Sequence, residues 1–163
     1  MDEATAELMA RNGIWLSFQP FTDDAAGATM APANRLRLLQ VIAGTERTIA
    51  LAKKHKLKMA FGTDLLFSAD LAARQGAELT KMRKWYSAPE LLTMATATNA
   101  QLLKLSGPRD PYPGRLGVVQ EGALADLLLV DGDPLTNIQL IEDPRRNLVV
   151  IMKDGKIFKN LLP

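Results

Sequence analysis

The chain has 163 residues, of which 47% are hydrophobic and 23% charged; this composition is typical of one folded globular domain and excludes disordered and fibrous classes. Its net charge of +2 is too small to indicate an obligatory nucleic-acid or anionic-membrane partner. The chain has no cysteine and a single histidine, His55, so it cannot build a disulfide scaffold, a thiolate metal site or a polyhistidine metal centre by itself.

The sequence shows neither the pattern of a targeting segment nor that of a membrane span. No apolar run approaches the roughly 20 residues that a bilayer span requires. The first 13 residues are acidic and amphipathic, which is typical of neither a signal peptide nor a transit peptide. We therefore expect no membrane partner, and the cellular location stays open.

The first 60 residues indicate an α/β arrangement. Apolar spacing predicts a helix over 2–11, which Gly13 ends because glycine accepts the left-handed conformation. A short strand is expected at 14–18, a loop at 22–33, an amphipathic helix at 34–55 and a second strand at 58–61. Strand, long helix and strand in this order predict a βαβ unit with parallel strands and a right-handed connection.

The remaining residues divide into a helical part and a β-rich part. After Asp64 comes a polar stretch, and then a helix is predicted to begin at Ser87, because Ser87 and Glu90 have the spacing of a capping box. A Pro- and Gly-rich segment, 106–117, marks a boundary. Beyond it three strands are expected within 125–130, 148–154 and 156–160, the last two joined by a hairpin at Asp154 and Gly155.

Asp64 is the first candidate functional residue. It follows the apolar strand of "KMAFGTD", and the carboxyl ends of strands in parallel α/β folds are where catalytic and binding groups gather. Aspartate is also a common turn former at such positions. From the strand end alone, both interpretations stay open.

Two other charged groups have a structural and a functional interpretation. The cations around His55, from Lys53 to Lys58, resemble an anion-binding patch, but cations at a helix end also complement the helix dipole, which we favour. The aspartates of the tail suggest either a calcium loop or turns. Their spacing lacks the pattern of an EF-hand, so turn chemistry is favoured for Asp126, Asp131 and Asp133.

Taken in order, three motifs resemble the C-terminal part of the metal-dependent amidohydrolase family, nearest to its imidazolonepropionase and Xaa-Pro dipeptidase-like members. "FGTD" at 61–64 is similar to the end of that family's eighth barrel strand. "LLTMATATNAQLLKL" at 91–105 is similar to its helix with an Ala-Thr-x-Asn-Ala core. "GRLGVVQEGALADLLLVDGDPL" at 114–135, followed by "VVIMKDGKIFKN", resembles its closing β segment.

The resemblance implies an α/β fold: the C-terminal portion of a (β/α)₈ TIM-like barrel plus a small β-sandwich tail. Residues 1–106 would supply about the last two βα units of the barrel, with 14–18 as its seventh strand and 58–61 as its eighth. Residues 107–163 would form the β-rich segment of a composite sandwich domain.

In that family one or two divalent metals are held by a His-x-His on the first strand, a carboxylated Lys or a Glu near the fourth, His residues on the fifth and sixth, and an Asp on the eighth. Only Asp64 maps onto this set. The resemblance implies that Asp64 accepts a proton from a metal-bound water that attacks a carbonyl carbon, passes it to the leaving nitrogen, and lies close to the metal.

A catalytic zinc takes about three protein ligands, and the chain matches one. We therefore expect a fragment of an amidohydrolase that hydrolyses amide or cyclic-amide C–N bonds, with zinc and a small amide or peptide-like substrate in the parent. The fragment alone should be inactive and bind no metal. The alternative is a non-catalytic assembly or binding module. Open strand edges also predict a homo-oligomer.

Overall fold

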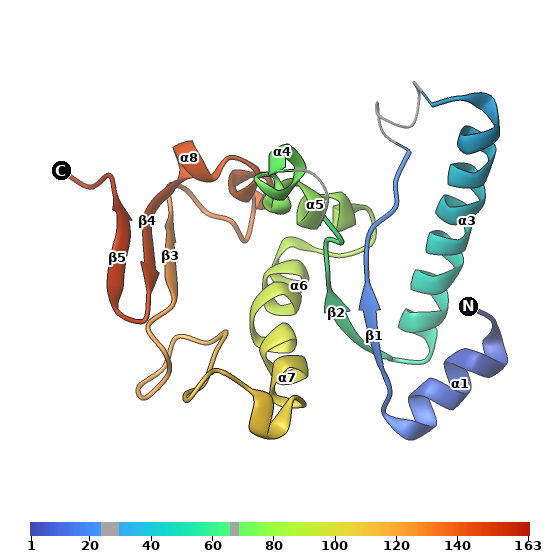
Figure 1. The fold of residues 1–163 in the computed structure, drawn as a ribbon, viewed down its shortest axis with the longest axis horizontal. Coiled ribbons are helices and arrows are strands. Elements are labelled where there is room, and N and C mark those ends of the chain that lie inside the picture. Colours follow the sequence, from blue (N-terminus) through green and yellow to red (C-terminus); the bar gives the residue numbers. More distant parts are fainter. Residues whose placement is uncertain (24–29, 66–68) are drawn as a thin grey trace. The chain divides into compact units, whose positions relative to one another are not determined.

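The computed structural model describes residues 1–23, 30–65 and 69–163 (Figure 1). The chain divides into two compact units, Met1–Met59 and Ala60–Pro163. The division passes through the strand β2, Lys58–Phe61. Within the described residues, no helix is both long enough and apolar enough to cross a membrane.

The first unit begins with the predicted helix, α1, Glu3–Asn12. It starts one residue after the predicted start, because the Asp2 carboxylate accepts a hydrogen bond from the Thr5 N–H at 2.9 Å and so caps the first turn. It ends at Gly13, whose φ of 61° is the left-handed conformation expected of a helix C-cap.

Strand, helix and strand follow in the predicted order. β1 is Trp15–Phe18, α3 is Pro32–Lys54, and β1 and β2 are neighbours in a two-stranded sheet. α3 begins two residues before the predicted start, since Pro32 is well accommodated in a first helical turn. The expected loop at 22–33 lies partly outside the described residues. The core of this unit consists of Ala6, Phe18, Thr45, Ile49, Ala52 and Met59.

The second unit contains helices that the sequence did not predict. The stretch after Asp64, expected to be a polar connection, includes α4, Ala69–Ala72, α5, Gln75–Lys81, and the 3₁₀ turn η1, Met82–Lys84. Leu79 and Met82 are buried. Tertiary packing therefore selects helix in a stretch that has no clear capping signal and contains a glycine.

The capping box predicted at Ser87 is present. Its N–H and its hydroxyl both donate to the Glu90 carboxylate, at 2.7 and 2.6 Å. Three consecutive helical elements follow: α6, Ala88–Thr93; the π-helical turn η2, Met94–Thr98; and α7, Asn99–Lys104. Leu91 and Met94 are buried.

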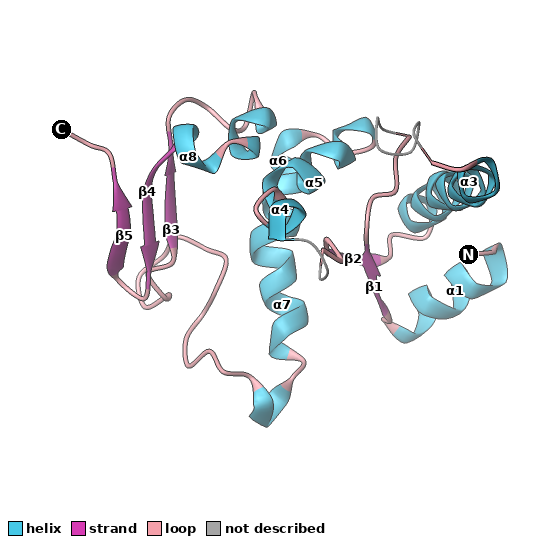
Figure 2. Ribbon diagram, turned by 45° about the horizontal axis from the view of Figure 1, so that its top comes forward, coloured by secondary structure: helices cyan, strands magenta, loops and turns pink. Residues whose placement is uncertain are grey.

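The tail forms an antiparallel sheet in the order β3-β4-β5 (Figure 2). Its strands are β3, Leu127–Val130, β4, Leu148–Lys153, and β5, Lys156–Asn160. The predicted β4–β5 hairpin is confirmed: Asp154 and Gly155 have φ of 49° and 74°, the left-handed pair that a tight hairpin turn requires. η3, Gly107–Arg109, η4, Ile138–Glu142, and α8, Pro144–Asn147, lie in the connections.

Of the tail aspartates, Asp133 lies in a turn as favoured from the sequence, whereas Asp126 contacts the distant β4–β5 hairpin. Asp133 accepts a hydrogen bond from the Leu135 N–H at 2.9 Å. Asp126 accepts one from the Asp154 N–H at 2.8 Å and pairs with the Lys153 ammonium at 3.0 Å. The observed sheet has three strands. The composite sandwich, and the domain border expected between residues 106 and 107, stay predictions.

Candidate functional site

Asp64 lies three residues after the last residue of β2, and its side chain is exposed. Its φ of 55° is in the left-handed region, which residues other than glycine seldom adopt, although aspartate does so more readily than most. Asp64 makes no hydrogen bond or ion pair with any residue that the structure describes. The carboxylate is therefore open to an external group.

The backbone that leads into Asp64 is held by Asn99, the first residue of α7. The Phe61 N–H donates to Asn99 Oδ1, and Asn99 Nδ2 donates to the Phe61 carbonyl oxygen, each at 2.9 Å. One side-chain amide thus satisfies both polar groups of the last strand residue, as a neighbouring strand would. This pair of bonds fixes the position from which residues 62–64 extend.

Asn99 directly follows the π-helical turn Met94–Thr98. A π turn inserts an extra residue into a helix and changes the direction in which the following side chains point, and such turns occur often at functional sites. Gly117 packs on this turn: a Cβ at Gly117 would lie 2.5 Å from the Thr96 carbonyl oxygen. The turn that presents Asn99 is therefore closely covered by the loop before β3.

Among the residues that the structure describes, the metal ligands that accompany such an aspartate in hydrolases do not surround Asp64. One group of three histidine or acidic side chains in this part of the chain has its ligand atoms within 4.8 Å of one another, and it consists of Glu3, Glu7 and His55. His55 caps the end of α3, before β2 begins, whereas Asp64 follows the end of β2. A single carboxylate does not meet the requirement for about three ligands, so the residues present do not fit a hydrolytic metal at Asp64.

The cations at the end of α3 make contacts within the first unit, and their favoured role at the helix dipole stays a prediction. The backbone N–H of His55 donates to the Leu51 carbonyl oxygen at 2.9 Å and so caps the helix. Lys54 pairs with Glu3 at 2.6 Å. The Lys58 ammonium lies 5.8 Å from the centre of the Trp15 ring, a cation–π contact.

A hollow of about 520 Å³ lies between α7 and the loop 113–118. Its lining includes Ala97, Lys104, Gly114, Arg115 and Val118. Lys104 is already paired with Asp110 at 2.5 Å. The described lining residues include no carboxylate and no histidine, so they offer none of the usual ligands of a hydrolytic metal.

Sequence reasoning found Asp64 and did not find a role for Asn99. Asn99 was visible only as part of the "ATATNA" motif, and its partner is 38 residues away. Neither the π turn nor the amide pairing leaves a periodic or spacing signal in the sequence. The available signal was an asparagine inside a predicted helix, where asparagine is a weak helix former.

Comparison with known proteins finds similarity to one family and to solved structures of the same fold. The model of the amidohydrolase family matches residues 2–158. A solved amidohydrolase is 30% identical, with a TM-score of 0.80 over 100% of this chain. A solved prolidase, in complex with N-methylphosphonate-L-proline, is 27% identical, with a TM-score of 0.79 over 98% of this chain. An ochratoxinase from A. niger, at 23% identity and a TM-score of 0.77 over 98% of the chain, shares the fold. No curated protein sequence matches.

The chain spans little more than a third of these structures: 38% of the amidohydrolase, 38% of the prolidase and 35% of the ochratoxinase. The similarity thus extends over nearly all of this chain and over a minor part of each solved protein. The α/β fold observed here is accordingly the fold of one part of those proteins.

Proposed function

Because the chain belongs to the amidohydrolase family, we propose that it is the C-terminal part of a hydrolase that cleaves amide or cyclic-amide C–N bonds, and that Asp64 is its proton acceptor. β1 and β2 are the seventh and eighth barrel strands in this proposal. The observation that carries it is the position of Asp64: an exposed carboxylate without partners among the described residues, just past the strand end that Asn99 holds.

The chemistry proposed for Asp64 uses what its position offers. Hydrolysis of a C–N bond requires a base that takes a proton from the attacking water and an acid that returns a proton to the leaving nitrogen. A single carboxylate can do both in succession. Since Asp64 carries no hydrogen bond from the described residues, its oxygens need not give up a partner before they receive the proton.

The family generally uses a divalent metal, and we propose zinc for the parent. The described residues of this chain do not fit such a metal by themselves, since Asp64 is the one ligand among them that matches the family's set. In this proposal the remaining ligands come from residues of the parent outside these 163. For this reason we propose that the isolated chain is inactive.

The solved prolidase suggests the chemical class of substrate. Its ligand is a phosphonate joined to proline, and at 27% identity we propose a related class for the parent: small amides or peptide-like molecules in which an acyl group is bound to nitrogen. The side chains of this segment do not narrow that class further.

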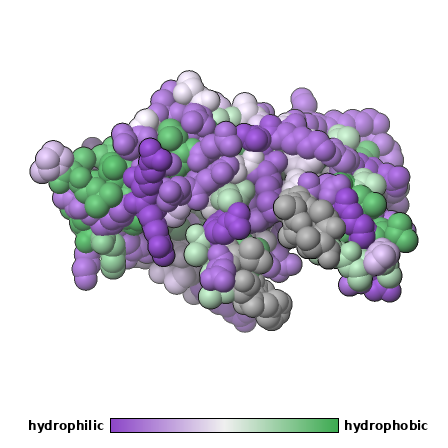
Figure 3. All heavy atoms as spheres, turned by 90° about the horizontal axis from the view of Figure 1, so that it is seen from above, coloured by the Kyte–Doolittle hydropathy of each residue, from purple (hydrophilic) through white to green (hydrophobic). Residues whose placement is uncertain are grey.

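Exposed apolar side chains of the tail support a partner for the sheet. Leu128 and Leu129 of β3, and Ile157 and Phe158 of β5, are between 48% and 63% exposed. In Figure 3 apolar side chains gather over this end of the second unit. A patch of this kind is typical of a surface covered by protein, and we propose that further strands of the parent, or a second copy of the chain, cover it.

The alternative is a non-catalytic assembly or binding module. The exposed apolar surface and the presence of a single candidate catalytic residue are compatible with this alternative as well. Amidase assays separate the two functions. The 163-residue chain should release no amine from N-acyl amino acids or Xaa-Pro dipeptides, with or without added zinc. The polypeptide that carries these residues in the cell should release amine from such substrates. Asp64→Asn should abolish that activity. Amidase activity of the 163 residues alone, with about one metal per chain, would contradict the fragment proposal.

A further inference from the structure

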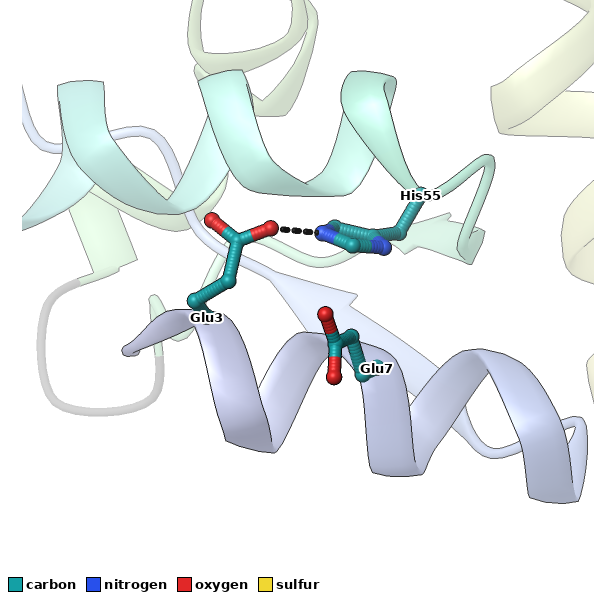
Figure 4. Close-up of side chains that lie close together, drawn as sticks. All are labelled: Glu3, Glu7 and His55. Atoms are coloured by element: carbon teal, nitrogen blue, oxygen red, sulfur yellow. Dashed lines mark hydrogen bonds and ion pairs between the residues drawn. The ribbon is translucent and has the colours of Figure 1, made fainter.

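The first unit holds a group of side chains that the proposed hydrolase chemistry does not use. Glu3 and Glu7 lie one turn apart on α1, and both point toward His55 at the end of α3 (Figure 4). Residues at i and i+4 share one face of a helix, so the two carboxylates are presented together. The ligand atoms of all three residues lie within 4.8 Å of one another.

The two carboxylates of this group differ in their partners. Glu3 Oε1 pairs with Lys54 Nζ at 2.6 Å and contacts His55 Nε2 at 2.5 Å. Glu7 has no ion pair or hydrogen bond with any residue that the structure describes, although its carboxylate approaches that of Glu3. The two carboxylates thus lie close together while one of them has no cationic partner among the described residues, and like charges at this separation destabilise one another. A divalent cation would remove that repulsion.

The imidazole is held in place while the carboxylates can adjust. The His55 side chain is only 16% exposed, compared with 47% for Glu3, and the backbone N–H of His55 is fixed on Leu51 at the helix end. One imidazole nitrogen and two carboxylate oxygens form a donor set suited to a first-row divalent cation such as zinc. Water would complete the coordination on the exposed side.

We propose that Glu3, Glu7 and His55 form a divalent transition-metal site on the first unit, separate from Asp64. It joins α1 to the end of α3, two elements that also pack on each other. Lys54 competes with the metal for Glu3, because the ammonium occupies the oxygen that would ligate it. This site revises the expectation that the chain binds no metal: the metal would be bound here, without hydrolytic activity.

The test is calorimetric titration of zinc chloride into the 163-residue chain at neutral pH. The expected result is one site per chain. Glu7→Gln and His55→Gln should each weaken binding by at least about tenfold, since each removes one of three ligands. Lys54→Gln should strengthen it, because it frees Glu3. Glu121→Gln, the same chemical change at an exposed glutamate outside the group, should leave affinity unchanged.

Because His55 is the only histidine, its imidazole signals in the NMR spectrum report on the site without ambiguity, and they should shift on zinc addition. Glu7→Gln protects the test against misfolding, since an exposed side chain without partners among the described residues is not needed for stability. The proposal is overturned if zinc does not bind, if binding survives both Glu7→Gln and His55→Gln, or if Asp64→Asn abolishes it. None of these outcomes bears on hydrolysis, which is measured separately.

Discussion

The side-chain amide of Asn99 holds both backbone polar groups of Phe61, accepting from its N–H and donating to its carbonyl oxygen, each at 2.9 Å. The carboxylate of Asp64 extends from the strand end that this pair fixes. Asn99, a helix residue, thus takes the place of a neighbouring strand at Phe61. It fixes the backbone position from which the segment that carries Asp64 extends.

Asn99→Ala should lower the free energy of unfolding by about 1–3 kcal/mol, because it leaves an N–H and a carbonyl of a half-buried strand end without partners. Asn99→Asp should also be destabilising, since it removes the donor and places a carboxylate against the Phe61 carbonyl oxygen. Urea denaturation measures both.

Asn12→Ala is the matched control. Asn12 makes one hydrogen bond, to the Leu8 carbonyl oxygen at 2.8 Å on the exposed end of α1, so its loss should change stability by less than about 0.5 kcal/mol. Equal effects of Asn99→Ala and Asn12→Ala would refute a special role for the Asn99 amide.

Two glycine-to-alanine substitutions should change the free energy of unfolding in opposite directions. A Cβ at Gly76 of α5 would lie 2.0 Å from the Ile141 carbonyl oxygen, so Gly76→Ala should destabilise by about 1–3 kcal/mol through overpacking. Gly44 lies inside α3, and a methyl group added there would meet no atom within 4 Å, so Gly44→Ala should stabilise by up to about 1 kcal/mol. Thermal unfolding of both variants and the wild type measures these changes in stability. If Gly76→Ala stabilised the protein, α5 would not pack closely on η4.

The β4–β5 turn should lose stability in acid through Asp126. Its hydrogen bond from the Asp154 N–H, followed by that from Lys153, lowers the pKa of the Asp126 carboxyl. A lowered pKa in the folded state stabilises the fold above the unfolded pKa, and this stabilisation is lost as the pH falls through the folded pKa.

The difference in unfolding free energy between the wild type and Asp126→Asn should therefore be present at about pH 6 and shrink toward about pH 3. Asp131→Asn is the control, since Asp131 is an exposed aspartate of the next turn, and its effect should be small throughout. A constant difference for Asp126→Asn across this range would exclude the charged hydrogen bonds as its source.

The exposed apolar side chains of the tail sheet should drive association of the isolated chain. Phe158 is 63% exposed on β5, and Phe158→Glu should shift the mass measured by light scattering at micromolar concentration toward that of a monomer. Val119, 88% exposed in a loop, is the control, since Val119→Glu should leave the mass unchanged. A monomeric wild type at every concentration would refute the proposed oligomer.

Local signals made much of the fold predictable. The β2 strand, the capped helix at Ser87 and the β4–β5 hairpin all depend on residues within a few positions of one another, where periodicity, capping and turn chemistry act directly. α4 and α5 were missed because their helical state depends on burial of Leu79 and Met82 by distant parts of the chain, and burial of that kind leaves no local signal.

The candidate site was predictable in one half. Asp64 was a candidate because it follows an apolar strand and matches a family motif; the structure places it exposed past β2, and its role stays a prediction. Asn99 was not given a role, because its partner Phe61 is 38 residues distant and the π turn that presents it has no sequence signature. The group at His55 was interpreted only as a helix end, since the sequence does not show that α1 brings Glu3 and Glu7 to it.

The most direct test is the rate of C–N bond hydrolysis by the polypeptide that carries these residues in the cell, compared between the wild type and Asp64→Asn. Asp70→Asn, a change of an exposed aspartate on α4, is the control. If Asp64 is the proton acceptor, Asp64→Asn should lower kcat/KM by at least about a hundredfold while its free energy of unfolding stays that of the wild type. A folded Asp64→Asn protein with the activity of the wild type would contradict the proposed role of Asp64.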